Sequence, residues 1–143
     1  MTRALREEFK VDGLPPALSH YADAVRFGDL LFVSGVTALG PDQRVVGEGD
    51  VVRQAQAVFE GLAKILEAAG ASFADVLKVT VFLLDVEDRS RINPVRQAYF
   101  GPHKPASTLI GVKALALPEL LIEIEAVVGL PQRAHSRTQQ TED

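Results

Sequence analysis

Cysteine does not occur among the 143 residues of this sequence. The chain therefore has no disulfide framework, no thiol nucleophile and no cysteine-ligated metal site. No stretch reaches the roughly 20 apolar residues of a membrane-spanning helix. The charged segment 1–16 also lacks the apolar core of a signal peptide. These absences predict a soluble, cytoplasmic protein without a membrane partner.

Basic charge is scarce as well. Lysine and arginine number 15 against 19 acidic residues, the net charge is −4, and the sequence pI is about 5.4. The basic residues are scattered, whereas a nucleic-acid-binding protein usually carries a basic patch. His20, His103 and His135 have no metal-ligand spacing, and glycine-rich phosphate loops and nucleophile elbows are absent. We therefore expect no nucleic-acid partner and no bound metal.

Apolar residues, in contrast, are abundant at 47% of the chain. A chain of this length is typical of one domain with a real core, because domains of this size bury about 68–70% of their unfolded surface. We expect a single domain over residues 1–131. The segment 132–143 has almost no apolar residues and is predicted to be a mobile tail.

One helix is clearly indicated by the sequence. Asp50 is a suitable N-cap, apolar residues recur at helical spacing from Val51 to Ala69, and Gly70 stands where a left-handed C′ residue belongs. A second helix is predicted from Pro94, with Asn93 as its N-cap and a turn and break before it, because proline interrupts a helix interior. Strands are predicted at 7–11, 24–36, 76–84, 107–114 and 120–128, with a hairpin turn at Gly28-Asp29.

The order of these elements predicts an α+β domain, a six-stranded mixed sheet with two helices on one face. The other face also needs cover, which an oligomer could provide. Glu123 and Glu125 lie two residues apart in a strand, so both point to one face, about 6.6 Å apart. They could be a solvated strand face or a subunit junction, or they could take part in chemistry.

Four segments at 27–35, 79–85, 104–108 and 121–126 resemble, in order and spacing, the reactive intermediate deaminase family (Rid, YjgF-like or L-PSP endoribonuclease-like). The resemblance covers about residues 20–130. It implies a chorismate-mutase-like fold and a homotrimer with ligand clefts between subunits. It also implies hydrolysis of an imine or enamine, such as 2-aminoacrylate, to a keto acid and ammonia, without a metal or organic cofactor.

The resemblance also implies roles for individual residues. Glu123 would position the water for hydrolysis, and Glu125 would be structural. Simpler explanations stay open for three residues: Tyr21 as a surface tyrosine, Ser34 as a strand hydroxyl bonded to backbone, and Asn93 as a helix cap. The substrate-binding residues implied are Tyr21, Ser34, Gly35, Asn93, Ser107 and Thr108.

Ser107 departs from the family pattern, which has an arginine at this position that grips the substrate carboxylate as a bidentate fork. Losing a hydrogen bond to a charged group costs about 1.5–3 kcal/mol, roughly tenfold to a hundredfold in affinity. Lys104 and Lys113 are candidate replacement cations. With serine at 107, we expect weak or absent deamination of 2-aminoacrylate.

Three interpretations of function remain at this point. The first is an imine or enamine deaminase acting on a small metabolite in an intersubunit cleft. The second is a trimer that binds a metabolite, such as a keto acid or related carbonyl compound, or another protein, without turnover. The third is a ribonuclease or translation inhibitor, which the acidic pI disfavours.

Overall fold

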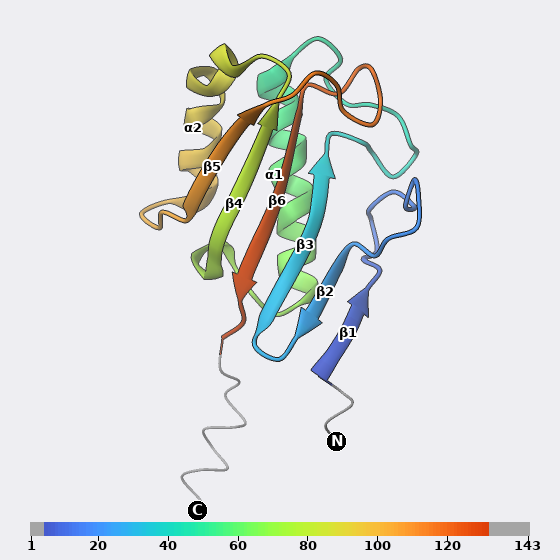
Figure 1. The fold of residues 1–143 in the computed structure, drawn as a ribbon, viewed down its shortest axis with the longest axis vertical. Coiled ribbons are helices and arrows are strands. Elements are labelled where there is room, and N and C mark those ends of the chain that lie inside the picture. Colours follow the sequence, from blue (N-terminus) through green and yellow to red (C-terminus); the bar gives the residue numbers. More distant parts are fainter. Residues whose placement is uncertain (1–4, 132–143) are drawn as a thin grey trace, which may run out of the picture.

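The computed structural model describes residues 5–131, which form a six-stranded sheet with two helices on one face (Figure 1). The strand order is β1-β2-β3-β6-β4-β5, and every neighbouring pair is antiparallel except β4 and β5. The predicted α+β architecture is confirmed. The predicted tail at 132–143 lies outside the described residues. The elements are β1 Arg6–Phe9, β2 Ala24–Phe27, β3 Leu30–Thr37, α1 Val51–Ala68, β4 Val76–Leu83, α2 Arg89–Phe100, β5 Ala106–Gly111 and β6 Ile122–Gly129.

The helix α1 has the capping that its sequence predicted. The Asp50 carboxylate accepts a hydrogen bond from the Arg53 backbone N–H at 3.1 Å. Gly70, just past the helix end, has a φ of +74°, a conformation that glycine adopts without strain. One side of α1 is buried against the sheet, including Phe59, Leu62 and Ile65.

The helix α2 differs from the prediction at its start. It runs unbroken from Arg89, so Asn93 is an exposed residue inside the helix rather than its N-cap, and Pro94 lies in the second turn. Pro94 removes one backbone hydrogen bond, but its side chain is exposed, while Ile92 and Val95 on either side are buried. Burial of those neighbours keeps the turn before the proline helical.

The fifth strand is shorter than predicted. β5 ends at Gly111, so Lys113 lies beyond the strand and does not share a strand face with Ser107. β5 is also an edge of the sheet, paired only with β4 among the described residues. The sheet's edge therefore leaves the outward backbone groups of β5 without strand partners.

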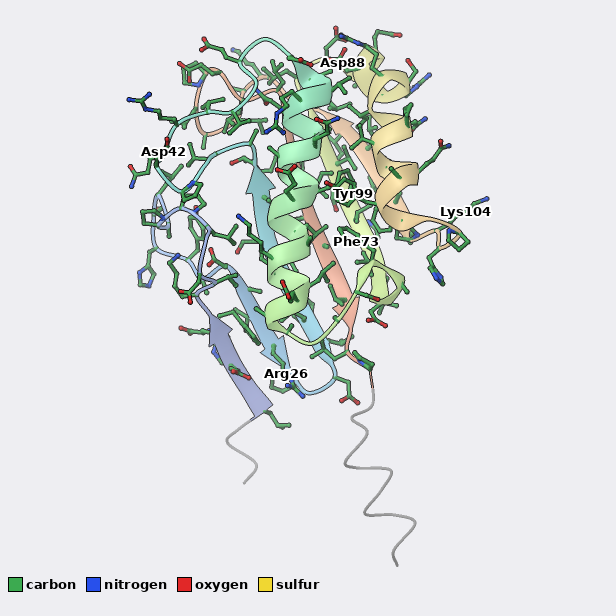
Figure 2. All side chains as sticks on the ribbon, turned by 180° about the vertical axis from the view of Figure 1, so that it is seen from behind. Arg26, Asp42, Phe73, Asp88, Tyr99 and Lys104 are labelled. Carbon is green, nitrogen blue, oxygen red and sulfur yellow. The ribbon has the colours of Figure 1, made fainter. Side chains whose placement is uncertain are left out.

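Four aromatic rings join the two helices. Phe59 of α1 stacks on Tyr99 of α2 with ring centroids 5.1 Å apart, and it meets Phe100 edge-on at 5.8 Å. Phe73 packs against Tyr99 and Phe100 at 5.4 and 5.3 Å. Figure 2 shows Phe73 and Tyr99 between the two helices. This cluster fixes α2 on the sheet, close to β5. Among the described residues, no helix is long and apolar enough to cross a membrane.

Replacing the central ring tests the importance of this cluster. Phe59 is fully buried, and we expect Phe59→Ala to lower the free energy of unfolding by about 3–5 kcal/mol, since it removes a large core side chain and leaves a cavity. Gln56→Ala, on the exposed side of the same helix, should change it by less than about 0.5 kcal/mol. Urea unfolding measures both. A loss below about 1 kcal/mol for Phe59→Ala would contradict the cluster's role.

Candidate functional site

The strand β6 separates apolar from acidic side chains. Ile122 and Ile124 are buried under the helices, and Glu123 and Glu125 share the opposite face, as predicted for these two glutamates; we call it the outer face. Glu123 is only partly exposed, whereas Glu125 is exposed. Residues 5–131 provide no salt bridge to either carboxylate. Glu123 is thus a half-buried acid without a counter-charge in the described protomer.

Gly35 allows the carboxylate of Glu123 to lie where it does. The register between β3 and β6 shifts between Val33 and Val36, a bulge that contains Ser34 and Gly35. A Cβ at position 35 would lie only 2.7 Å from the Cδ and 3.0 Å from the Cγ of Glu123. Only glycine leaves this space, so the bulge seats the Glu123 carboxylate directly on the β3 backbone.

Two effects raise the pKa of Glu123 above its usual value. The larger is burial, which disfavours the charged form, and the second is the negative charge of Glu125 on the same face. A carboxyl group with a raised pKa releases and recaptures a proton more readily near neutral pH. A raised pKa is one requirement for a carboxyl group that is to act as a general base and acid.

A hollow of about 190 Å³ lies between the loop 13–21, the strand β3 and the helix α1. Tyr21, Ser34 and Gly35 line it together, but Glu123 does not. The Ser34 hydroxyl donates to the Ala22 carbonyl at 2.7 Å, the simpler role considered from sequence. The Tyr21 hydroxyl accepts from the Leu18 backbone N–H at 3.3 Å, which leaves its own proton free to donate. Gly35 is the residue that links this hollow to Glu123.

The remaining predicted binding residues lie elsewhere. Ser107 pairs with Val79, a residue buried under the helices, so its side chain lies on the helical face at the sheet edge. Thr108 lies on the outer face, where its hydroxyl accepts from the Lys78 ammonium at 3.1 Å. Asn93 is exposed on α2. None of these three residues lines the hollow next to β3.

One residue at this edge, Arg96, was not predicted from the sequence. The Nη2 of Arg96 donates to the Ser107 hydroxyl at 3.0 Å. Burial lowers the pKa of Arg96 below its ordinary value. The sequence predicted a helix in this part of the chain, although from Pro94 rather than from Arg89, and nothing in it indicated which turn of the helix would face β5. Lys104 is exposed on the loop after α2, where Figure 2 shows it pointing away from the sheet.

One protomer cannot bring Glu123 and Ser107 to the same small ligand. Glu123 pairs with Phe82 of β4, and Ser107 pairs with Val79 of the same strand. Across the sheet the two residues are therefore separated by two strand spacings of about 4.8 Å each, and along it by three residues of about 3.3 Å each. Together these give a separation of about 14 Å. They also face opposite sides of the sheet. A cleft that uses both must combine two copies of the chain. No three His, Asp or Glu side chains within 5–131 are grouped to hold a metal ion.

Comparison with known proteins gives a consistent result. Residues 13–130 match the family described as Endoribonuclease L-PSP. A RutC family protein of Pyrococcus horikoshii is 37% identical over 86% of this chain and 97% of its own length. The mouse protein named 2-iminobutanoate/2-iminopropanoate deaminase is 32% identical over 89% of this chain and 93% of its own. The crystal structure of RidA from an Antarctic Psychrobacter superposes with a TM-score of 0.81 at 31% identity, covering 87% and 99% of the two chains.

The chain therefore belongs to the Endoribonuclease L-PSP family, which is the Rid or YjgF-like family that its motifs resembled.

The raised pKa of Glu123 makes a prediction about stability. In the folded protein the neutral form of Glu123 is favoured. Its contribution to folding stability is therefore fully present below the pKa that Glu123 has in the unfolded chain. That contribution is lost as the pH rises through the higher pKa that Glu123 has in the folded protein. We expect Glu123→Gln to raise the melting temperature relative to wild type above that window, and to have little effect at pH 3–4.

Thermal unfolding at several pH values measures this difference. Glu48→Gln, at an exposed loop position, is the control and should change stability little at any pH. If Glu123→Gln were equally neutral at low and high pH, the carboxyl group would not be held in the environment described here.

Proposed function

We propose that this protein hydrolyses small imines or enamines to carbonyl compounds and ammonia, in a cleft completed by a second copy of the chain within a homotrimer. The observation that carries the proposal is Glu123, a half-buried carboxyl group with a raised pKa, seated on Gly35 and facing outward. The proposal needs no metal or organic cofactor. The ligands it predicts are an imine or enamine and the keto acid or related carbonyl product.

The reaction requires one group that moves a proton twice. As a water molecule attacks the carbon of the C=N bond, the Glu123 carboxylate takes a proton from it, the π electrons move to nitrogen, and nitrogen takes up a proton from solvent. The resulting carbinolamine then breaks its C–N bond while the Glu123 proton goes to the departing amine and the hydroxyl proton returns to solvent as the C=O bond forms. Water and imine are consumed, ammonia and the carbonyl compound are formed, and the carboxylate is regenerated. An enamine first becomes the imine by protonation at carbon and loss of a proton from nitrogen.

The names of two relatives and the position of Tyr21 support this chemistry. The mouse relative is named for deamination of 2-imino acids, and an Arabidopsis relative, 33% identical over 87% of this chain, is named Reactive Intermediate Deaminase A. Tyr21 lines the hollow that adjoins Gly35, and its free hydroxyl proton could hold a carbonyl or imine group of the ligand.

The outer face supports assembly. Several large apolar side chains are exposed there, more than a monomer ordinarily leaves in one area. The β5 edge next to it also has unpaired backbone groups, which a second copy could cover. The exposed apolar residues of the outer face are Phe27, Leu30, Phe32, Leu77 and Ile110.

Assembly can be tested with a single charge. We expect wild-type protein to have the mass of a trimer in light scattering at micromolar concentration. Phe32→Glu places a charge at a half-exposed ring on the outer face, and we expect it to dissociate the trimer, because a buried unpaired charge is costly. Gln56→Glu, which adds a charge on the solvent side of α1, should remain trimeric. A monomeric wild type would refute the proposed assembly.

Turnover can be tested with imines made in place by an amino-acid oxidase. Semicarbazide traps the imine as a semicarbazone, whose absorbance falls when an enzyme hydrolyses the imine first. We expect wild type to reduce this absorbance, and Glu123→Gln to slow hydrolysis by about 10²–10⁴-fold while folding normally, since it removes the general base.

Glu125→Gln is the matched control on the same strand face. It should retain turnover but move the acidic limb of the pH profile to lower pH, because the charge of Glu125 raises the pKa of Glu123. If wild type hydrolysed no imine, or Glu123→Gln were as active as wild type, the trimer that binds a metabolite without turnover would be the better description.

A further inference from the structure

The most unusual cation in the described chain is Arg96. Its guanidinium is half-buried between α2 and the β5 edge, and its Nη2 donates to the neutral hydroxyl of Ser107 at 3.0 Å. Arg91, on the same helix, is exposed and forms a salt bridge with Asp88 at 3.2 Å. Across residues 5–131, none of the salt bridges involves Arg96.

A guanidinium has five N–H donors and carries its charge at every physiological pH. Burying half of it against a neutral hydroxyl costs solvation without returning a charge–charge attraction. The lowered pKa of Arg96 has this same cause. Such a group gains most when an anion binds to its free edge, where two parallel N–H donors match the two oxygens of a carboxylate.

The position of Arg96 is set by rigid structure rather than by a loop. Val95 is buried, and Tyr99, one turn further along α2, stacks on Phe59. On the other side, the Ser107 hydroxyl belongs to a strand with full parallel pairing to β4. The helix and the strand thus hold the guanidinium at the sheet edge that the shared cleft requires.

We propose that Arg96, oriented by the Ser107 hydroxyl, supplies in this chain a guanidinium that binds the carboxylate of the ligand. This inference rests on the proposed hydrolase and assigns the cation of its binding site. Arg96 is the binding residue, and Ser107 is a positioning residue. The serine at 107 then does not remove the cation from the site, because α2 supplies one instead. Deamination of 2-aminoacrylate is expected to be substantial, contrary to the expectation from Ser107 alone.

The binding test uses 2-oxobutanoate and its neutral analogue 2-oxobutanamide, titrated into the assembled full-length protein by calorimetry. We expect wild type to prefer the acid, and Arg96→Gln to weaken binding of the acid by about tenfold to a hundredfold while leaving the amide unaffected. Arg91→Gln is the matched control on the same helix and should bind both compounds as wild type does. Ser107→Ala should weaken acid binding by a smaller factor.

Two further variants guard against misfolding and locate the charge. Arg96→Lys keeps the charge but not the fork, and should bind the acid with intermediate affinity. Adding Ser107→Arg to Arg96→Gln should restore acid binding, since it returns a guanidinium to the same edge. Melting temperature and oligomeric mass are recorded for every variant.

Imine turnover on the same preparations separates this inference from the proposed hydrolase. Arg96-dependent binding of the acid without turnover would support the carboxylate site and refute the hydrolase. Turnover of 2-imino acids with an unchanged KM in Arg96→Gln would support the hydrolase and overturn the role of Arg96. The inference also fails if wild type does not bind 2-oxobutanoate, or if Arg96→Gln weakens the acid and the amide equally.

Discussion

A single-layered sheet has two faces, and the helices of this protein cover only one of them (Figure 1). Every strand is affected by this asymmetry. β6 places Ile122 and Ile124 under the helices and its two glutamates on the outer face. β3 places Phe32 on the same outer face, half-exposed. The uncovered face thus holds both the acid proposed for catalysis and the apolar surface proposed for assembly, so burial of one accompanies burial of the other.

This coupling would give the proposed trimer a role in the chemistry. Covering the outer face with a second copy would remove more water from Glu123, whose pKa is already raised by burial within one protomer. The same contact would bring a β5 edge, with Arg96 and Ser107, toward the carboxylate. The acid proposed to move the proton and the cation proposed to hold the substrate would then come from different copies. A single sheet keeps Glu123 and Ser107, the hydrogen-bond partner of Arg96, on opposite faces and about 14 Å apart.

Local patterns in the sequence predicted most of the fold. The cap at Asp50, the glycine at 70 and the alternation in β6 depend on a few neighbouring residues, and each is found where expected. Pro94 was misleading, because burial of the residues beside it outweighs one lost hydrogen bond. Burial of this kind is a tertiary effect that a local pattern does not contain.

The candidate site was less accessible from sequence. Family resemblance pointed to Glu123 and Gly35, and the structure puts them in contact. The family resemblance also showed that position 107 lacks arginine. It did not show that Arg96 reaches that position from α2. Arg96 and Ser107 are 11 residues apart in the chain, and their contact depends on how the aromatic cluster packs α2 against the sheet. Lysines 104 and 113 were better candidates by distance along the chain alone.

The claim that two copies share each site has a direct test in mixed oligomers. Glu123→Gln and Arg96→Gln protomers are co-refolded, and imine hydrolysis is measured at a substrate concentration well below KM, where each variant alone is expected to have little activity. If the acid and the cation come from different copies, random mixing gives about a quarter of the sites both native residues, so activity should rise to roughly a quarter of wild type. If both residues served a ligand within one protomer, no site would regain the pair, and a mixture no more active than its components would contradict this account.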